Sequence, residues 1–287
     1  MIKTCLLGMG RTGMVVAEQL LSSKDFLLNS IIAKPGSLKS GKKIQDFLRT
    51  DQEIIISDSE NLTTEIKEKR FKVAIDFTTP EASIKNAAIL AENGIHLVIG
   101  TTGFNNMQLY ELKRLVQRYK IGLVYAPNIS VGINLLISVA KTIARLIPHY
   151  DVEITETCHQ GKKDAPSGTA LKIASEIFSM KGLTEKAEPI KFGRKGKTKR
   201  ESGEIGIHSL RSGGNAGVHK VLFAGKADEI EITHRSFSQS IYADGALKAA
   251  GFIAGVKGFF HMEDVLLMER MDRDMRVAAN RLFLKYN

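Results

Sequence analysis

Residues 4–13 read Thr-Cys-Leu-Leu-Gly-Met-Gly-Arg-Thr-Gly, an apolar run that ends in the pattern G-x-G-x-x-G. A chain with 25 glycines among 287 residues produces this pattern by chance in about one case in five, so its context decides its meaning. Residues 4–8 have the composition of a strand, and Met14–Leu21 places Val15, Val16 and Leu20 on one side of a helix. Glycines between a strand and a helix allow a tight turn and a close approach by a pyrophosphate. The stretch therefore predicts a Rossmann-like dinucleotide-binding fold, the alternative being a merely structural turn.

The first half of the chain alternates apolar strand-like runs with helical patterns. A helix is expected to start at Pro80, with Thr79 as N-cap, and to end at Asn93-Gly94. Another is expected over Gln108–Arg118. Further strands are expected over 27–33, 53–57, 72–77, 96–99 and 121–126. Strands separated by helices of this length indicate a doubly wound parallel sheet.

After Pro127 the pattern changes to alternation of apolar and polar residues, as in the segments around Val152, Ile205 and Ile230. Alternation is typical of half-exposed strands, so a smaller α+β domain with a mixed or antiparallel sheet is expected, with one helix over about 167–180. Residues 242–258 form an Ala/Gly-rich helical pattern like those of the first half. The expected division is a dinucleotide-binding domain over 1–128, a substrate-binding and oligomerisation domain over 129–240, and a C-terminal segment over 241–287 that returns to the first domain.

Composition restricts the class of protein and of partner. Forty-one Lys and Arg against 31 Asp and Glu give a formal charge of +10, which favours anionic partners. Two cysteines cannot build a disulfide framework, and the start of the chain runs directly into the glycine motif without a signal sequence. Residues 121–140 carry no charge, but Pro127-Asn128 and Asn134 favour a strand, a loop and a buried helix over a membrane span. We expect a cytoplasmic protein with no membrane partner.

Lys34 follows the second strand, where an NAD site would place an acidic residue for the ribose hydroxyl. A lysine there can neutralise a 2′-phosphate, with Ser37 or Lys39 as helpers. NADPH is therefore favoured over NADH, and the alternative is an ordinary solvated lysine.

Several longer motifs, in order, resemble the dihydrodipicolinate (4-hydroxy-tetrahydrodipicolinate) reductase family. Residues 164–170 read Asp-Ala-Pro-Ser-Gly-Thr-Ala, 100–104 read Gly-Thr-Thr-Gly-Phe, and 126–132 read Ala-Pro-Asn-Ile-Ser-Val-Gly. Asp-Phe-Thr at 76–78, Ile-Gly-Ile-His-Ser-Leu-Arg at 205–211 and Gly-Val-His at 217–219 match as well, so the resemblance spans residues 1 to about 267.

This resemblance implies an oxidoreductase that reduces 4-hydroxy-tetrahydrodipicolinate to tetrahydrodipicolinate in lysine and diaminopimelate biosynthesis, as a homotetramer that uses NADPH or NADH. It implies cofactor contacts from Gly8, Gly10, Arg11, Thr12, Gly13, Phe77, Gly100, Thr101, Thr102, Ala126 and Asn128. It also implies that Ser167, Gly168 and Thr169 bind a substrate carboxylate, together with His159 and Lys162. Independently, the start of a helix at Ser167 would offer unpaired N–H groups to a carboxylate, although Ser167 is equally suited to capping that helix.

The expected proton donor departs from the family pattern. In the family, two adjacent histidines and a lysine precede the Asp-Ala-Pro-Ser motif, whereas here Cys158 occupies the first histidine position, followed by His159 and Lys162. A thiol is largely protonated at neutral pH but, unlike imidazole, does not readily regain a proton near pH 7. Lys162 is the first candidate for the proton donor, His159 the second and Cys158 the third, the alternative for Cys158 being a small buried hydrophobe.

Three further features bear on function. Gln239 stands where the family usually has an arginine, which leaves open a paralogous reductase of another cyclic unsaturated imino acid, or a non-enzymatic NADP-binding regulator. Residues 191–200 hold six basic residues, which we interpret as a loop that closes on anionic ligands. No nucleic-acid partner is expected, because the stretch has Phe192 but no series of aromatic side chains on which bases could stack. His208, His219 and His234 lack metal-ligand spacing, so no metal is expected. The tail over 268–287 suggests one amphipathic helix.

Overall fold

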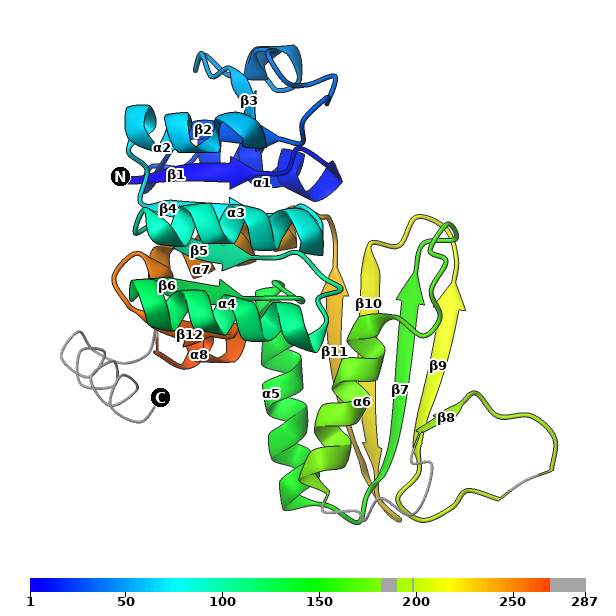
Figure 1. Ribbon diagram of the computed structural model, residues 1–287. Coiled ribbons are helices and arrows are strands. Elements are labelled where there is room, and N and C mark those ends of the chain that lie inside the picture. Colours follow the sequence, from blue (N-terminus) through cyan, green and yellow to red (C-terminus); the bar gives the residue numbers. More distant parts are fainter. Residues whose placement is uncertain (182–189, 198, 269–287) are drawn as a thin grey trace. The chain divides into compact units, whose positions relative to one another are not determined.

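The computed structural model describes residues 1–181, 190–197 and 199–268, which form two compact units. The first unit comprises Met1–Val131 together with the described chain from Ser240 onward, and the second comprises Gly132–Gln239 (Figure 1). The tail helix expected over 268–287 lies, apart from its first residue, outside the described residues.

The first unit is built on a seven-stranded parallel sheet. Its strands are β1 (Ile2–Leu7), β2 (Phe26–Ala33), β3 (Ile56–Asp58), β4 (Val73–Asp76), β5 (His96–Ile99), β6 (Gly122–Tyr125) and β12 (Gly258–Phe260). They lie in the order β12-β6-β5-β4-β1-β2-β3, which confirms the predicted doubly wound fold. The order changes direction at β1, so the loops after β1 and β4 meet at the point where such sheets bind their ligands.

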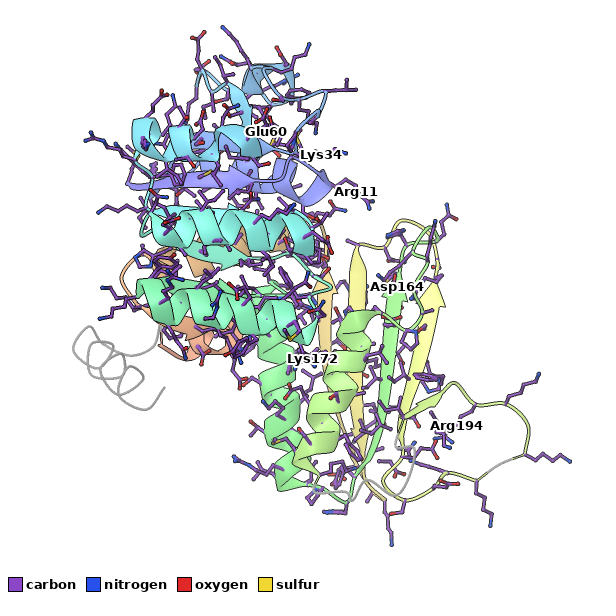
Figure 2. The ribbon with its side chains drawn as sticks, in the orientation of Figure 1. Arg11, Lys34, Glu60, Asp164, Lys172 and Arg194 are labelled. Carbon is purple, nitrogen blue, oxygen red and sulfur yellow. The ribbon has the colours of Figure 1, made fainter. Side chains whose placement is uncertain are left out.

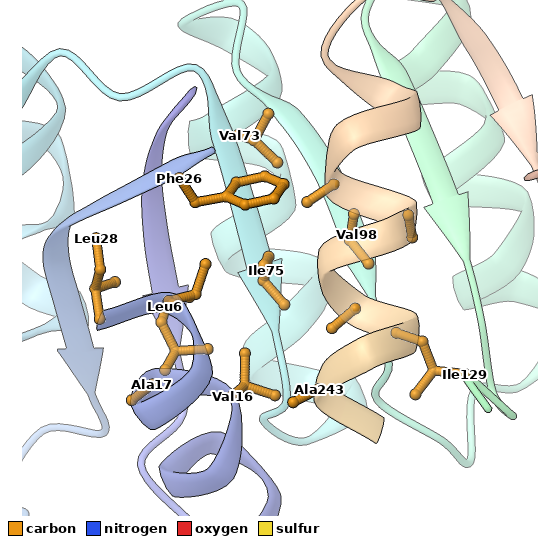
Figure 3. Close-up of a cluster of buried hydrophobic side chains, with 14 of the residues drawn as sticks. Leu6, Val16, Ala17, Phe26, Leu28, Val73, Ile75, Val98, Ile129 and Ala243 are labelled. Carbon is orange, nitrogen blue, oxygen red and sulfur yellow. The ribbon is translucent and has the colours of Figure 1, made fainter. Parts of the chain in front are cut away.

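Helices cover both faces of this sheet, and the strand residues alternate between the two cores. The helices are α1 (Arg11–Leu21), α2 (Leu62–Lys69), α3 (Pro80–Glu92), α4 (Asn106–Tyr119), α7 (Ser240–Ile253) and α8 (Met262–Met268), with short 3-10 turns at Ile44–Asp46 and Ser59–Asn61. Leu6 of β1 packs with α1 and α7 (Figure 3), whereas Leu7 packs on the face of α2, α3 and α4. Burial on both faces explains why these strands read as continuous apolar runs.

Helix α7 is rich in small residues because it packs closely on its neighbours. Ala243, Ala246 and Ala250 are fully buried, and a Cβ on Gly245 would lie 1.8 Å from the carbonyl oxygen of Ile129. The expected helix over 242–258 is wrong at its end, because α7 stops at Ile253 and Gly258 begins β12. Gly258 has φ of +134° and donates its N–H to the Ile121 carbonyl, so sheet pairing replaces the helix there.

The apolar run at 54–56 is only partly in the strand expected over 53–57, because β3 includes only Ile56–Asp58. The Ile44 N–H donates to the Ile54 carbonyl and the Ile56 N–H to the Lys42 carbonyl. The preceding segment therefore takes most of the backbone pairing of this run, an outcome that apolar composition alone does not reveal.

The second unit contains a five-stranded mixed sheet with two helices on one face. The strands are β7 (Asp151–Cys158), β8 (Ile190–Phe192), β9 (Ile205–Arg211), β10 (Gly217–Ala224) and β11 (Glu229–Ser236), and the helices are α5 (Val131–Leu146) and α6 (Gly168–Met180). The order is β11-β10-β7-β9-β8, with β10 antiparallel to both of its neighbours, β11 and β7, and with β7, β9 and β8 parallel. The predicted mixed sheet and the helix after Ser167 are both confirmed.

Candidate functional sites

The glycine motif forms a loop, and glycine is present at its three positions for different physical reasons. Gly8 has φ of +96°, and a Cβ there would lie 2.3 Å from the Phe77 carbonyl oxygen. A Cβ on Gly13 would lie 1.9 Å from the Gly8 carbonyl oxygen, so both positions exclude any side chain. A Cβ on Gly10, by contrast, would meet nothing within 4 Å, and Gly10 lines a pocket. Two glycines are required by the fold, whereas the third leaves room for a ligand.

Helix α1 starts directly from this loop, at Arg11, three residues earlier than the sequence pattern indicated. Its N-cap is Gly10, no side chain caps it, and no acidic residue lies in its first turn. The first N–H groups of a helix carry partial positive charge and lack intrahelical acceptors, so this end is suited to a phosphate.

The pocket beside the loop has a volume of about 240 Å³. Its lining consists of Gly10, Arg11, Thr12, Gly13, Phe77, Thr78, Gly100, Thr101 and Thr102. Gly100 is needed there because a Cβ would lie 2.2 Å from the Phe77 ring. The structure thus brings together most of the residues expected to contact a cofactor, from the loops after β1, β4 and β5.

The remaining cofactor candidates lie outside this lining. Gly8 packs closely against the Phe77 carbonyl group. The Ala126 N–H donates to the Ile99 carbonyl at 2.8 Å, which extends the backbone pairing of β6 by one residue. Asn128 Oδ1 accepts from the Ser130 N–H at 3.2 Å, which shapes the turn before α5. Lys34 is exposed at the carboxyl-terminal edge of the sheet, as is Arg11 (Figure 2).

Lys39, expected only as a helper, contacts the glycine loop directly. Its Nζ donates to the Met9 carbonyl at 2.6 Å and lies 5.4 Å from the centre of the Phe47 ring. This ammonium therefore stands beside the loop expected to hold the dinucleotide.

Asp76 and Thr78, at the two ends of the Asp-Phe-Thr motif, were not among the residues expected in the site. Asp76 is buried at the end of β4, and its Oδ1 accepts from the Thr78 N–H, the Thr78 hydroxyl and the Thr101 hydroxyl at 2.9, 2.6 and 2.9 Å. Burial raises the pKa of this carboxyl, against the opposing effect of those hydrogen bonds. Asp76 thus joins the loops after β4 and β5, both of which line the pocket.

In the second unit, the loop over 164–169 leads into α6. Ser167 is the N-cap of α6, since its hydroxyl accepts from the Ala170 N–H at 3.2 Å. The expectation that Ser167 offers an unpaired N–H is wrong, because this N–H donates to Glu156 Oε1 at 3.0 Å. The next residue, Gly168, is exposed at the first position of the helix. Of the residues expected to bind a carboxylate, Ser167 thus has its amide occupied within the protein, whereas Gly168 is exposed.

Glu156, which was not predicted from the sequence, fixes this loop by accepting the hydrogen bond from the Ser167 N–H. Its carboxylate is fully buried, and Oε1 also accepts from the Ser209 hydroxyl and from Arg211 Nη2, both at 2.8 Å. Arg211 Nη2 additionally donates to the Asp164 carbonyl. Burial alone would raise the pKa of Glu156, but the bonds from Ser167, Arg211 and Ser209 outweigh it and the pKa is lowered.

Polar residues in register with Glu156 form a row across the five-stranded sheet. Strand pairing places Ser209, Glu156, His219 and His234 side by side on β9, β7, β10 and β11. His219 Nε2 lies 3.5 Å from the Ser167 hydroxyl and 3.8 Å from Glu156 Oε2. Burial lowers the pKa of His219 to about 4, so the imidazole is neutral at physiological pH. The sequence placed Ser209 and His219 in motifs shared with the family, but it did not predict that they lie beside Glu156 and His234.

The three candidate proton donors occupy different environments. Lys162 Nζ lies 2.8 Å from Asp164 Oδ1 and is partly exposed, and His159 is exposed. Cys158 is buried, and burial raises the pKa of its thiol, followed by the effect of the Glu156 charge. Of the three side chains, only those of Lys162 and His159 are available to a ligand from solvent.

The basic stretch over 191–200 is partly used by the fold itself. Arg194 and Arg200 both contact the Glu153 carboxylate, and Arg194 lies 2.6 Å from Glu204 Oε1. Arg194 and Arg200 therefore form ion pairs within the second unit, and the interpretation of this stretch as a loop that closes on anionic ligands stays a prediction. Gln239 is exposed just before α7.

Neither a metal centre nor a membrane-spanning helix is found in the described chain. Among residues 1–181, 190–197 and 199–268, no group of three or more His, Cys, Asp or Glu side chains is arranged to hold a metal ion. Within the same ranges, no helix has the length and apolar character needed to cross a membrane.

A parallel sheet with a G-x-G-x-x-G loop, an uncapped helix and a pocket at the switch point defines a Rossmann-type nucleotide-binding protein. In the second unit, a basic loop that carries His159, Lys162 and Lys163 precedes the N-terminus of α6. Cations beside a helix N-terminus are suited to binding carboxylates.

Comparison with known proteins specifies the family. Residues 2–129 match the model of the dihydrodipicolinate reductase N-terminus, and residues 132–266 match that of its C-terminus. The chain belongs to the dihydrodipicolinate reductase family.

Relatives support this assignment over nearly the whole chain. The 4-hydroxy-tetrahydrodipicolinate reductase of Methanosarcina barkeri is 39% identical, over 93% of this chain and 99% of that protein. The enzyme of the same name from Ralstonia nicotianae is 40% identical, over 90% and 96%. Among solved structures, a dipicolinate-bound dihydrodipicolinate reductase from Paenisporosarcina sp. TG-14 aligns with a TM-score of 0.75 and 25% identity, over 91% of this chain and 97% of that one.

Proposed function

We propose that this protein reduces 4-hydroxy-tetrahydrodipicolinate to tetrahydrodipicolinate in lysine and diaminopimelate biosynthesis, with NADPH preferred and NADH also accepted. One observation carries the proposal. The same chain has a pocket beside a glycine loop of the dinucleotide-binding type and a basic loop at the N-terminus of α6 that is suited to a carboxylate. Its relatives over the same two units carry the name of this activity.

The first unit fits a dinucleotide at its phosphates. Gly10 leaves open space, and the N-terminus of α1 has neither a side-chain cap nor an acidic residue. The pyrophosphate would lie against Gly10, Arg11, Thr12 and Gly13, and the nicotinamide end against Phe77, Gly100, Thr101, Thr102, Ala126 and Asn128. When bound, the reduced nicotinamide supplies a hydride. Lys34 and Lys39 would interact with a 2′-phosphate, and the contact between Lys39 and the Met9 carbonyl supports that assignment.

The second unit would hold the dicarboxylate. One carboxylate would lie at the N-terminus of α6, against Ser167, Gly168 and Thr169, with His159 and Lys162 as its cationic or donor neighbours. Dipicolinate, which is bound in the Paenisporosarcina structure, is a planar cyclic dicarboxylate, and this supports the same class of ligand here.

The overall reaction takes up one hydride and one proton and releases water, so a proton donor is required. Lys162 is our first choice, because it is a partly exposed cation held by Asp164 at 2.8 Å. His159 is the second choice. Cys158 is the weakest, since its sulfur is buried and its raised pKa keeps the thiol protonated.

The proposed enzyme is a cytoplasmic homotetramer. Cys5 and Cys158 are both free thiols, which favours a reducing compartment. One face of the five-stranded sheet carries α5 and α6, whereas Leu210, Val218 and Leu222 on the other face are not fully buried and offer apolar surface to a second copy. Mass measurement in solution, by light scattering, tests the tetramer.

The activity is tested by following the loss of NADPH absorbance with enzymatically generated substrate. Turnover with the natural substrate is expected, whereas NADPH binding without turnover on any cyclic imine would favour the non-enzymatic regulator. Replacement of Lys162 by Ala is expected to lower kcat about 100-fold or more, because general acids contribute on that scale. Lys172→Ala, on the exposed side of α6 and paired with Glu176, is the control and should leave the rate unchanged.

The departure at Cys158 has its own test. Cys158→Ser is expected to change kcat less than about twofold, since a buried thiol that keeps its proton contributes little to acid catalysis. A large loss in this variant would assign the proton donor to the thiol. If Cys158→His accelerates turnover, the histidine of the family pattern is a functional acid that this chain lacks.

A further inference from the structure

The hydrogen bonds around Asp76 determine where the hydroxyl hydrogens of two pocket residues lie. A threonine hydroxyl has one hydrogen to donate and two lone pairs to accept with. The hydroxyls of Thr78 and Thr101 lie 2.6 and 2.9 Å from Asp76 Oδ1, and a carboxyl oxygen that receives them acts as acceptor. Each hydroxyl therefore donates its only hydrogen to Asp76.

These hydroxyls can then interact with a ligand only by accepting a hydrogen bond on a remaining lone pair. Thr101 Oγ1 also accepts from the Thr78 N–H at 2.9 Å, which leaves it one lone pair, and the second contact of Thr78 Oγ1, with the Thr79 carbonyl, is long at 3.4 Å. Both threonines line the pocket, Thr78 as a partly exposed residue and Thr101 as a residue that is 4% exposed. This part of the pocket consequently presents hydrogen-bond acceptors, whereas the start of α1 presents donors.

We propose that Asp76 is a positioning residue that fixes Thr78 and Thr101 as acceptors, and that these receive an N–H or O–H donor of the bound dinucleotide. The inference rests on the proposed function, since it assumes that a nicotinamide dinucleotide occupies the pocket. Two groups of that cofactor have the required chemistry, namely the NH₂ of the nicotinamide carboxamide and a ribose hydroxyl. Anionic oxygens, which have no hydrogen, would be repelled from this end and directed toward α1.

The role of Asp76 depends on an acceptor atom rather than on charge. All three donors meet at Oδ1, so an asparagine with its carbonyl oxygen in that place would keep them. Asp76→Asn is therefore expected to bind NADPH within about threefold of the unmodified protein. Asp76→Ala frees both hydroxyls to rotate, and we expect it to weaken binding about tenfold.

The test measures binding of NADPH and of its reduced 3-acetylpyridine analogue by fluorescence, without substrate. The analogue keeps the carbonyl of the carboxamide and lacks its NH₂. Thr101→Val and Thr78→Val remove one acceptor each at nearly constant volume, and Thr101→Ser is the matched control that retains the hydroxyl. Far-UV circular dichroism checks the fold of each variant, and the valine variants keep the test decisive should Asp76→Ala fail to fold.

We expect NADPH to bind about tenfold more weakly to at least one valine variant, with Thr101→Ser close to the unmodified protein. If that variant also loses the preference for NADPH over the analogue, the donor is the carboxamide; equal losses for both ligands assign it to a ribose hydroxyl. Unchanged affinity for both ligands in both valine variants would overturn the inference while leaving the proposed function intact. Absence of NADPH binding to the unmodified protein would overturn both.

Discussion

Asp76 in the first unit and Glu156 in the second are both buried carboxyl groups near the ends of strands, and each organises a loop of a candidate site. Their partners differ. The donors to Asp76 Oδ1 that the structure describes are neutral, two hydroxyls and one backbone N–H, and burial raises the pKa of Asp76. Glu156 receives the guanidinium of Arg211 as well as a hydroxyl and an N–H, and its pKa is lowered despite burial. At Glu156 the bonds from Ser167, Arg211 and Ser209 together outweigh burial, whereas at Asp76 burial outweighs the hydrogen bonds.

The difference fits the ligand proposed for each loop. In the first unit, positive character comes from the start of α1, and the loops held by Asp76 provide acceptors. In the second unit, Arg211 neutralises Glu156, so a carboxylate ligand near Ser167 does not meet an uncompensated negative charge. Neutral partners suit the proposed cofactor pocket and a charged pair suits the proposed substrate site.

Removal of the cation should produce the largest effect. Arg211→Met leaves the fully buried Glu156 carboxylate without its charged partner, and we expect a loss of about 3 kcal/mol in the free energy of unfolding. Thr101→Val, which removes one neutral donor to Asp76, should lose only about 1 kcal/mol. Urea unfolding measures both. The double variant Glu156→Met/Arg211→Met should recover most of the loss, and equal losses for Arg211→Met and Thr101→Val would contradict the distinction between the clusters.

Each cluster should control its own ligand. Ser167→Ala is expected to raise the KM for the dicarboxylate about tenfold and to leave the Kd of NADPH unchanged, because Ser167 belongs to the loop held by Glu156. Thr101→Val should do the reverse. Steady-state kinetics and cofactor titration separate the two quantities. Ser179→Ala, near the other end of α6, is the control for loss of a serine hydroxyl from this helix. A change in both constants for either variant would show that the clusters are not independent.

The pH dependence of stability should have opposite signs for the two carboxyls. A raised pKa in the folded state means that Asp76 favours the fold below about pH 3.9 and that this contribution is lost as the pH rises. A lowered pKa means that Glu156 contributes stability above about pH 4.3, which is lost as the pH falls through its folded-state value. Relative to the unmodified protein, Asp76→Asn should therefore gain stability as the pH rises above about 4, by at most about 1.4 kcal/mol per pH unit.

Glu156→Gln should instead show a deficit that is full above about pH 4.3 and shrinks below it. Thermal unfolding of both variants between pH 3 and 7 measures the two curves. The same slope for both variants would mean that the two carboxyls share one environment.

Local patterns along the chain were enough for much of the fold and part of the sites. The apolar run before Gly8 and the N-cap at Thr79 indicated the parallel sheet and the start of α3, since strand burial and helix capping depend on neighbouring residues. The extent of the strand near Ile55 and the end of α7 were wrong, because distant segments compete for the same backbone groups. Glu156 and Arg211 were missed for the same reason, as 55 residues separate the two partners.

The sequence by itself determined the family, the glycine loop and the basic loop before α6, because each is carried by residues adjacent in the chain. Only the tertiary structure decided that the Ser167 amide is already occupied, that Lys39 contacts the glycine loop, and that Asp76 orients two pocket hydroxyls. These are statements about which donor meets which acceptor. Such pairing depends on strand order and register, which bring together groups that no spacing in the sequence relates.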